Sequence, residues 1–215
     1  MKKIISKHKF HWKNKSFQTD IFLGSLIFIL SLFTNHLASI YANKMASNYV
    51  TDILLDNLPV VDVDGILIYG TILFFTFVVG CLIAEPKRTP FVLKSAGLFY
   101  LIRSVFIMLT HLGPVPDQTP IEIGNILDKI ISGNDFFFSG HAGFTFLIAL
   151  IFWDEKWIRN AALFTCMIFS IGVLLGHLHY SIDVFAAFFI TYSILHIAKR
   201  IFKSDYKLFH TEDNC

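Results

Sequence analysis

The sequence predicts an all-α, polytopic membrane protein with six transmembrane helices and both termini in the cytoplasm. The chain of 215 residues is 54% hydrophobic, has only 16% charged residues and contains 24 phenylalanines. A soluble domain of this length is rarely so apolar. The apolar residues also fall into long runs, and the basic residues gather between those runs. These three observations place the chain in a membrane.

Six apolar runs come close to the roughly 20 residues that a helix needs to cross the hydrocarbon core. No repeat or linker divides the chain, so we expect one transmembrane domain over 21–201. A basic N-terminal segment, 1–20, precedes it and a tail, 202–215, follows it. No cleavage signature follows the first run, so we expect it to stay as a membrane anchor. The expected spans are 21–41, 65–84, 91–112, 136–153, 157–175 and 182–201.

The positions of Lys and Arg predict the orientation, because cytoplasmic loops carry an excess of both. Basic residues fill the N-terminal segment, the second-to-third and fourth-to-fifth connections and the tail, which share one side if there are six spans. The opposite loops, 42–64, 113–135 and 176–181, contain only two Lys or Arg residues, Lys44 and Lys129. Both termini are therefore expected in the cytoplasm.

Two imidazoles and a carboxylate lie at the start of the sixth expected span, in the segment 177–184, HLHYSIDV. Side chains four positions apart share a helix face, so Asp183 can accept a hydrogen bond from the inner ring nitrogen of His179. Such a carboxylate would hold a nucleophilic imidazole in one tautomer. The alternative is a hydrogen-bonded pair that only caps and orients the helix. Titratable groups at membrane depth are costly, which makes each one a functional hypothesis.

A second polar segment, Ser139-Gly140-His141, precedes the fourth expected span. His141 is a candidate general acid, or alternatively an interfacial histidine. Gly140 permits a tight backbone whose N–H groups, at a helix start, could hold a phosphate. Arg103, inside the third expected span, could reach an anionic headgroup or form a structural salt bridge. With six spans, both polar segments lie on the same extracytoplasmic, or lumenal, face.

Charge and cysteine content argue against several partners. The formal net charge of +2 is small and the charges cluster at segment ends, so we expect a lipid surface and no nucleic acid as partner. Of the three cysteines, two lie in apolar runs and one is the last residue, which describes neither a disulfide framework nor a metal site. His177 and His179 have the spacing of a metal pair, but no set of acids or cysteines completes a coordination sphere. We expect no metal and no cofactor.

Four blocks of the chain match a known pattern. HYSIDV at 179–184 looks like an H-Y-T-I-D-V block, and DFFFSGH at 135–141 is similar to G-D-Y-L-F-S-G-H. YLIR at 100–103, with PVP at 114–116, looks like a Y-L-x-R helix ending in P-V-P. LPVVD at 58–62 is similar to an L-P-D segment. Together these blocks resemble the sphingomyelin synthase family, a branch of the type 2 phosphatidic acid phosphatase superfamily.

The resemblance implies six spans, an outward-facing site and a metal-independent reaction in two steps. His179 would attack the phosphorus of a lipid headgroup to form a phosphorus–nitrogen intermediate, and Asp183 would orient it. His141 would protonate the departing diacylglycerol and then deprotonate the acceptor hydroxyl. Asp135 corresponds to an acid that the family places beside this centre. The expected substrate contacts are Arg103, Ser139, Gly140 and Tyr180.

The expected activity is transfer of phosphocholine, or a related phosphoalcohol, from a glycerophospholipid to ceramide or diacylglycerol. The phosphatase branch has a lysine–arginine block and an S-R pair six or seven residues before its second histidine, and those positions are Gly172 and Val173 in this chain. Because those arginines clamp a phosphomonoester with its extra negative charge, their absence favours a phosphodiester. The loop between Pro116 and Asp135 is short, so the choice of acceptor stays open.

Other functions are also open. Hydrolysis, in which water replaces the lipid acceptor, would give a lipid phosphatase or a phospholipase C-type activity. A small transporter could use Arg103, His141, His179 and Asp183 as a polar pathway, although such pathways spread through the membrane depth and these histidines and acids gather at one face. A metal-dependent CDP-alcohol transferase is disfavoured, because the D-G-x-x-A-R pattern is absent after Asp64.

Overall fold

The computed structural model describes residues 2–115 and 137–211. The described residues form helices joined by loops and contain no β-strand, so the predicted all-α class is confirmed for this part of the chain. Two short 3-10 turns, Leu55–Asn57 and Pro86–Arg88, lie between helices. The helices are α1 Lys2–Trp12, α2 Lys15–Met45, α3 Asp64–Ala84, α4 Thr89–Leu109, α6 Gly140–Ile151, α7 Lys156–Leu175, α8 Ser181–Ile201 and α9 Lys203–His210.

Within residues 2–115 and 137–211, five helices are long and apolar enough to cross a membrane. They are α2, α3, α4 with the turn before it, α7 and α8, and they coincide with five of the six predicted spans. The remaining prediction, 136–153, corresponds to α6. That helix has 12 residues, which at about 1.5 Å per residue covers less than a core of about 30 Å. A multi-pass membrane protein is therefore supported, and the count of six stays a prediction.

Helix α6 is shorter than its apolar run because polar and turn residues end it on both sides. The hydroxyl oxygen of Ser139 accepts the N–H of Ala142 at 3.5 Å and caps the helix start. The last helical residue is Ile151, and a turn through Phe152 leads into α7. Phe137 and Phe138, just before Ser139, therefore lie outside the helix even though they are apolar.

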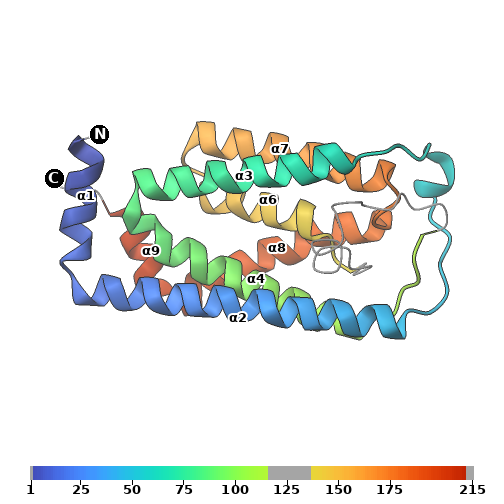
Figure 1. The fold of residues 1–215 in the computed structure, drawn as a ribbon, viewed down its shortest axis with the longest axis horizontal. Coiled ribbons are helices and arrows are strands. Elements are labelled where there is room, and N and C mark those ends of the chain that lie inside the picture. The colour runs from blue at the N-terminus through green and yellow to red at the C-terminus, as the bar shows by residue number, and fades with distance from the viewer. Residues whose placement is uncertain (1, 116–136, 212–215) are drawn as a thin grey trace.

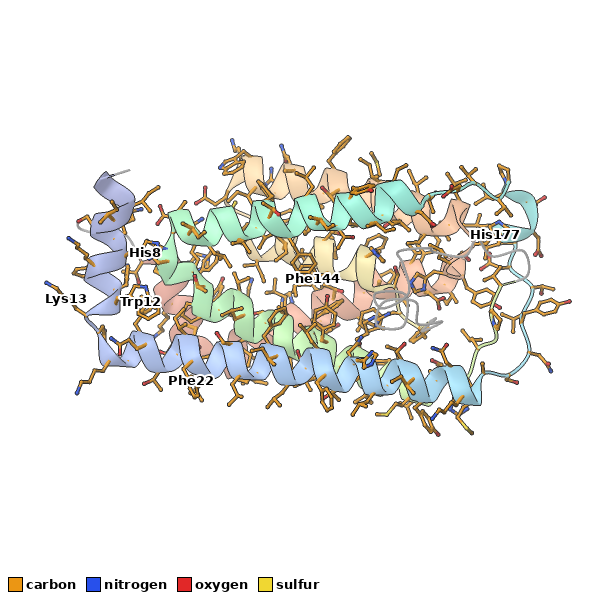
Figure 2. All side chains as sticks on the ribbon, in the orientation of Figure 1. His8, Trp12, Lys13, Phe22, Phe144 and His177 are labelled. Atoms are coloured by element: carbon orange, nitrogen blue, oxygen red, sulfur yellow. The ribbon has the colours of Figure 1, made fainter. Side chains whose placement is uncertain are left out.

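Helix α6 forms the centre of the bundle. It packs against α7 and α8, while α2 packs along α4 and α3 packs against α7 (Figure 1). Leu147, Ile148 and Ala149 of α6 are fully buried. Phe144, in the middle of the bundle in Figure 2, stacks on Phe75 with ring centroids 5.1 Å apart. The core therefore holds α6 firmly, and α6 carries His141 in its first turn.

The two ends of the bundle differ. Helices α1 and α9 lie at one end, and α1 runs across the direction of the long helices (Figure 1). The connections from α2 to α3 and from α7 to α8 lie at the opposite end (Figure 1). The first and last helices thus share one end, as the predicted topology requires. The assignment of this end to the cytoplasm stays a prediction.

A buried ion cluster ties three helices together at the end that carries α9. The Nζ of Lys94 on α4 lies 2.8 Å from carboxylate oxygens of both Asp20 on α2 and Asp205 on α9. Burial raises the pKa of the Asp205 carboxyl above its ordinary value, although the Lys94 ammonium partly opposes this rise. A second pair, Arg88 with Glu155, links the turn before α4 to the start of α7.

Candidate active site

The segment that opens α8 brings His179 against Asp183. The Nδ1 of His179 lies 3.5 Å from Oδ2 of Asp183, and the same oxygen accepts the backbone N–H of Tyr180 at 2.9 Å. Asp183 is fully buried and His179 is 6% exposed. Tyr180 is extended, so the chain turns sharply into the helix and the carboxylate can reach back to cap it. Since Nδ1 faces the carboxylate, Nε2 is the ring nitrogen directed away from Asp183.

A backbone hydrogen bond joins the two polar segments. The N–H of Ser139, just before α6, donates to the carbonyl oxygen of Asp183 at 3.2 Å. Both groups are buried, so this contact fixes the start of α6 beside the start of α8. The structure thus brings Ser139 and Gly140 next to the segment that carries His179, across about 40 residues of sequence.

Arg103 of α4 lies against the same backbone. Its Nε donates to the carbonyl oxygen of Phe138 at 2.9 Å, and its Nη1 donates to Oδ1 of Asn35 on α2 at 3.0 Å. A Cβ added at Gly140 would lie 3.3 Å from Nε of Arg103, so the glycine permits this close packing. The guanidinium also interacts electrostatically with Asp183. Arg103 is 4% exposed, which makes it an internal cation of the site.

His141 occupies the second position of α6. Its ring packs edge-on against Phe169 of α7, with centroids 5.5 Å apart, and the residue is partly exposed. The backbone carbonyl of His141 accepts the hydroxyl of Thr145 at 2.7 Å, which stabilises the first turn. The imidazole therefore stands at the end of the bundle where α8 begins. Its role as a general acid stays a prediction.

Loops from two distant parts of the chain hold Tyr180 and Ser181. The Tyr180 hydroxyl donates to the carbonyl of Gly113 at 2.9 Å and accepts the N–H of Val50 at 3.3 Å. Burial raises the pKa of this phenol. The N–H of Ser181 donates to Oδ2 of Asp52 at 2.7 Å. Burial raises the pKa of Asp52, but the hydrogen bonds from Ser181, Leu54 and Leu55 outweigh this and hold the pKa below its usual value.

His177 has an unusual backbone conformation and environment. Its φ of 53° lies in the left-handed region, which residues other than glycine rarely adopt. The side chain is 7% exposed, and neither ring nitrogen has a hydrogen-bond partner in the part of the chain that the structure describes. Figure 2 places it at the opposite end of the bundle from His8 and Trp12. The residue therefore differs from His179, which has a carboxylate beside it.

Asp135 lies outside the described residues, so its place relative to the site stays a prediction. Among residues 2–115 and 137–211, no group of three or more His, Cys, Asp or Glu side chains gathers as metal ligands would. Sequence reasoning did not single out Asn35 or assign a role to Asp52. Asn35 could have been noticed as an amide within an apolar run, whereas nothing in the sequence separates Asp52 from the other acids of its loop.

Residues 132–200 match the family model described as PAP2 superfamily C-terminal. The matched segment covers less than half of the chain and contains His141, His179 and Asp183. A comparison with curated proteins gives no match. The family match supports a place for this chain in the type 2 phosphatidic acid phosphatase superfamily, whose members are typically enzymes that act on phospholipids.

Proposed function

We propose that this protein is a metal-independent lipid headgroup phosphotransferase of the sphingomyelin synthase type. It moves phosphocholine, or a related phosphoalcohol, from a glycerophospholipid to ceramide or diacylglycerol through an intermediate on His179. The observation that carries the proposal is the direct link between the two polar segments, in which Asp183 faces His179 with its carboxylate and holds Ser139 with its carbonyl. One residue thereby orients the nucleophile and anchors the helix that bears the general acid.

In the first step, the lone pair on Nε2 of His179 attacks the phosphorus of the donor. The bond between phosphorus and the glycerol oxygen breaks, and protonated His141 gives its proton to that oxygen, so diacylglycerol leaves. The headgroup phosphate is then bound to His179 through a P–N bond. Asp183 stabilises the positive charge that develops on the imidazole and keeps the proton on Nδ1.

In the second step, neutral His141 removes the proton from the hydroxyl of the acceptor lipid. The acceptor oxygen attacks phosphorus, the P–N bond breaks and its electron pair returns to Nε2 of His179. Both histidines recover their starting protonation states, so the cycle needs no other reactant. Two separate displacements of this kind predict ping-pong kinetics.

The cationic groups of the site fit a phosphodiester. Arg103 is the one arginine that the described residues place at the site, and it already donates to Phe138 and Asn35. Gly172 and Val173 occupy the positions of the S-R pair of the phosphatase branch, and both are buried in α7. A phosphodiester has one negative charge where a phosphomonoester approaches two, so it needs fewer cationic partners.

The site belongs on the extracytoplasmic, or lumenal, face in this proposal. It lies at the end of the bundle away from α1 and α9 (Figure 1). The N-terminal segment and the tail carry many of the basic residues, which favours the cytoplasm for that end. Donor and acceptor lipids would then both come from the outer leaflet.

The test uses purified protein with headgroup-labelled phosphatidylcholine, with and without ceramide, in the presence of a chelator. We expect labelled sphingolipid from the wild type, its loss in His179→Ala, and full activity in His196→Ala, which removes an exposed histidine of the same helix. Labelled phosphocholine released at the same rate without ceramide would indicate hydrolysis instead. Diacylglycerol with shorter acyl chains than the donor is also tried as acceptor, so that its labelled product can be told from the donor. Absence of labelled sphingolipid, labelled short-chain phosphatidylcholine and labelled phosphocholine would contradict the proposal.

A further inference from the structure

Asp52 lies in the loop between α2 and α3, yet it contacts the first residue of α8. Its Oδ2 accepts the N–H of Ser181 at 2.7 Å, although the two residues are 129 positions apart. Its Oδ1 accepts the N–H groups of Leu54 at 2.9 Å and Leu55 at 3.3 Å. The side chain is buried. One carboxylate therefore shapes its own loop and holds the start of a distant helix.

The contact between Asp52 and Ser181 gives a backbone N–H of α8 an acceptor that the helix itself cannot provide. The first N–H groups of a helix have no acceptor within the helix, and a negative charge is favourable there. Asp183 accepts the N–H of Tyr180 from inside the helix, and Asp52 accepts the next one, from Ser181. His179 directly precedes these two residues. Two carboxylates from different elements thus fix the backbone that carries the imidazole.

A second set of contacts fixes the same segment through Tyr180. Its hydroxyl bridges the N–H of Val50 and the carbonyl of Gly113. The two loops are also joined to each other, because the N–H of Gly113 donates to the carbonyl of Asn48 at 3.2 Å. A Cβ at Gly113 would lie 2.4 Å from the carbonyl oxygen of Ser47, so the loops meet too closely for any other residue. The loop that carries Asp52 is thus held in place.

We infer that Asp52 is a positioning residue, which aligns His179 with Asp183 by holding the first turn of α8. This inference rests on the proposed function for its effect on turnover, but the contact itself can be tested without activity. Nδ1 of His179 and Oδ2 of Asp183 are 3.5 Å apart, which is near the upper limit for a hydrogen bond. If the first turn of α8 frayed, this contact would therefore be lost. Loss of Asp52 should therefore lower the rate of headgroup transfer more than the binding of the donor lipid.

The kinetic test compares Asp52→Ala and Asp52→Asn with Asp56→Asn, which removes the same charge from an exposed position of the same loop. We expect Asp52→Ala to lower kcat by roughly 10- to 100-fold with little change in KM for phosphatidylcholine. Asp52→Asn should fall between this variant and the wild type, because its amide oxygen can replace one acceptor. Asp56→Asn should match the wild type. An unchanged kcat in Asp52→Ala would overturn the inference.

The structural test measures hydrogen exchange at the amides of Tyr180 and Ser181 in the same proteins. We expect faster exchange at these amides in Asp52→Ala, normal exchange in the middle of α8, and wild-type exchange in Asp56→Asn. Unchanged exchange in Asp52→Ala would contradict the contact. If the wild type transfers no headgroup, the proposed function fails, and exchange alone then decides whether Asp52 holds the segment. Faster exchange with a wild-type kcat would refute the positioning role.

Discussion

The backbone N–H of Ser139 donates to the carbonyl oxygen of Asp183 at 3.2 Å, and this bond joins the starts of α6 and α8. Both helices begin near this point, so the positive ends of their dipoles lie close together, although the carboxylates of Asp183 and Asp52 already accept the N–H groups of Tyr180 and Ser181. The start of α6 and the guanidinium of Arg103 supply the positive charge that a bound anion would need beside these carboxylates. In the proposed function, that anion is the phosphate of the lipid headgroup.

Asp183→Asn should remove catalysis without removing the fold. The asparagine oxygen can still accept the N–H of Tyr180, so the helix start keeps its cap. The charge that stabilises an imidazolium on His179 is lost, and the amide can orient the ring in the wrong tautomer. We expect kcat to fall by about 10³- to 10⁴-fold, with a melting temperature close to that of the wild type. A variant that keeps most of its activity would show that Asp183 only caps the helix.

Gly140→Ala should disturb the site through Arg103. The added methyl group would lie 3.3 Å from Nε of the arginine, whose hydrogen bonds to Phe138 and Asn35 restrict its movement. We expect roughly a tenfold loss of kcat/KM, since a small displacement of a positioned group is costly. Gly80→Ala in α3 is the matched control, because nothing lies within 4 Å of its added carbon. Equal activity of the two variants would argue against a tight contact.

Lys94→Met should destabilise the protein strongly. It leaves the carboxylates of Asp20 and Asp205 without their shared cation, and the Asp205 side chain is only 2% exposed. Breaking a buried ion pair from one side costs about 3–5 kcal/mol. Denaturation in detergent micelles would measure the loss, with Lys203→Met as the exposed control on α9. Similar free energies of unfolding for the two variants would contradict a stabilising role of the cluster.

The contribution of Asp52 to stability should disappear in acid. The pKa of this carboxyl is held below its ordinary value of 3.8 in the folded protein. A lowered folded-state pKa means that the stabilisation is complete above the unfolded-state value and is lost as the pH falls through the folded-state value. The difference in free energy of unfolding between the wild type and Asp52→Asn should thus be constant from about pH 7 to 5 and shrink below about pH 4. If the difference in free energy of unfolding instead grew as the pH fell, the pKa of Asp52 would not be lowered by folding.

Much of the fold could be predicted because apolar run length directly reports membrane-crossing helices. Five predicted spans agree with α2, α3, α4, α7 and α8 to within a few residues at most ends. The larger difference is α2, which extends to Lys15 and Met45, because Asn14 caps it and polar residues at both ends continue the helix. The predicted span over 136–153 is longer than α6, since Phe137, Phe138 and the turn after Ile151 lie outside the helix and hydropathy does not mark a cap.

The sequence could predict only those contacts of the site that join residues close together in the chain. Helical spacing predicts the pairing of His179 with Asp183, and the structure places the two side chains together, although His179 lies just before the helix and Asp183 reaches back toward it. The contacts of Arg103 with Asn35 and of Asp52 with Ser181 join residues 68 and 129 positions apart. Such contacts depend on how the helices pack and on the paths of the loops. Local sequence periodicity carries no information about either. Asp52 in particular is indistinguishable from Asp56 until the loop is folded.

The central claim, a covalent intermediate on His179, can be tested by trapping it. Purified protein is incubated with phosphatidylcholine labelled in its phosphate, without any acceptor lipid, and the denatured protein is examined by mass spectrometry. The account predicts an acid-labile phosphocholine group on His179 that is absent in His179→Ala and disappears when ceramide is added. Label found on His141, or transfer to ceramide without any label on the protein, would contradict it.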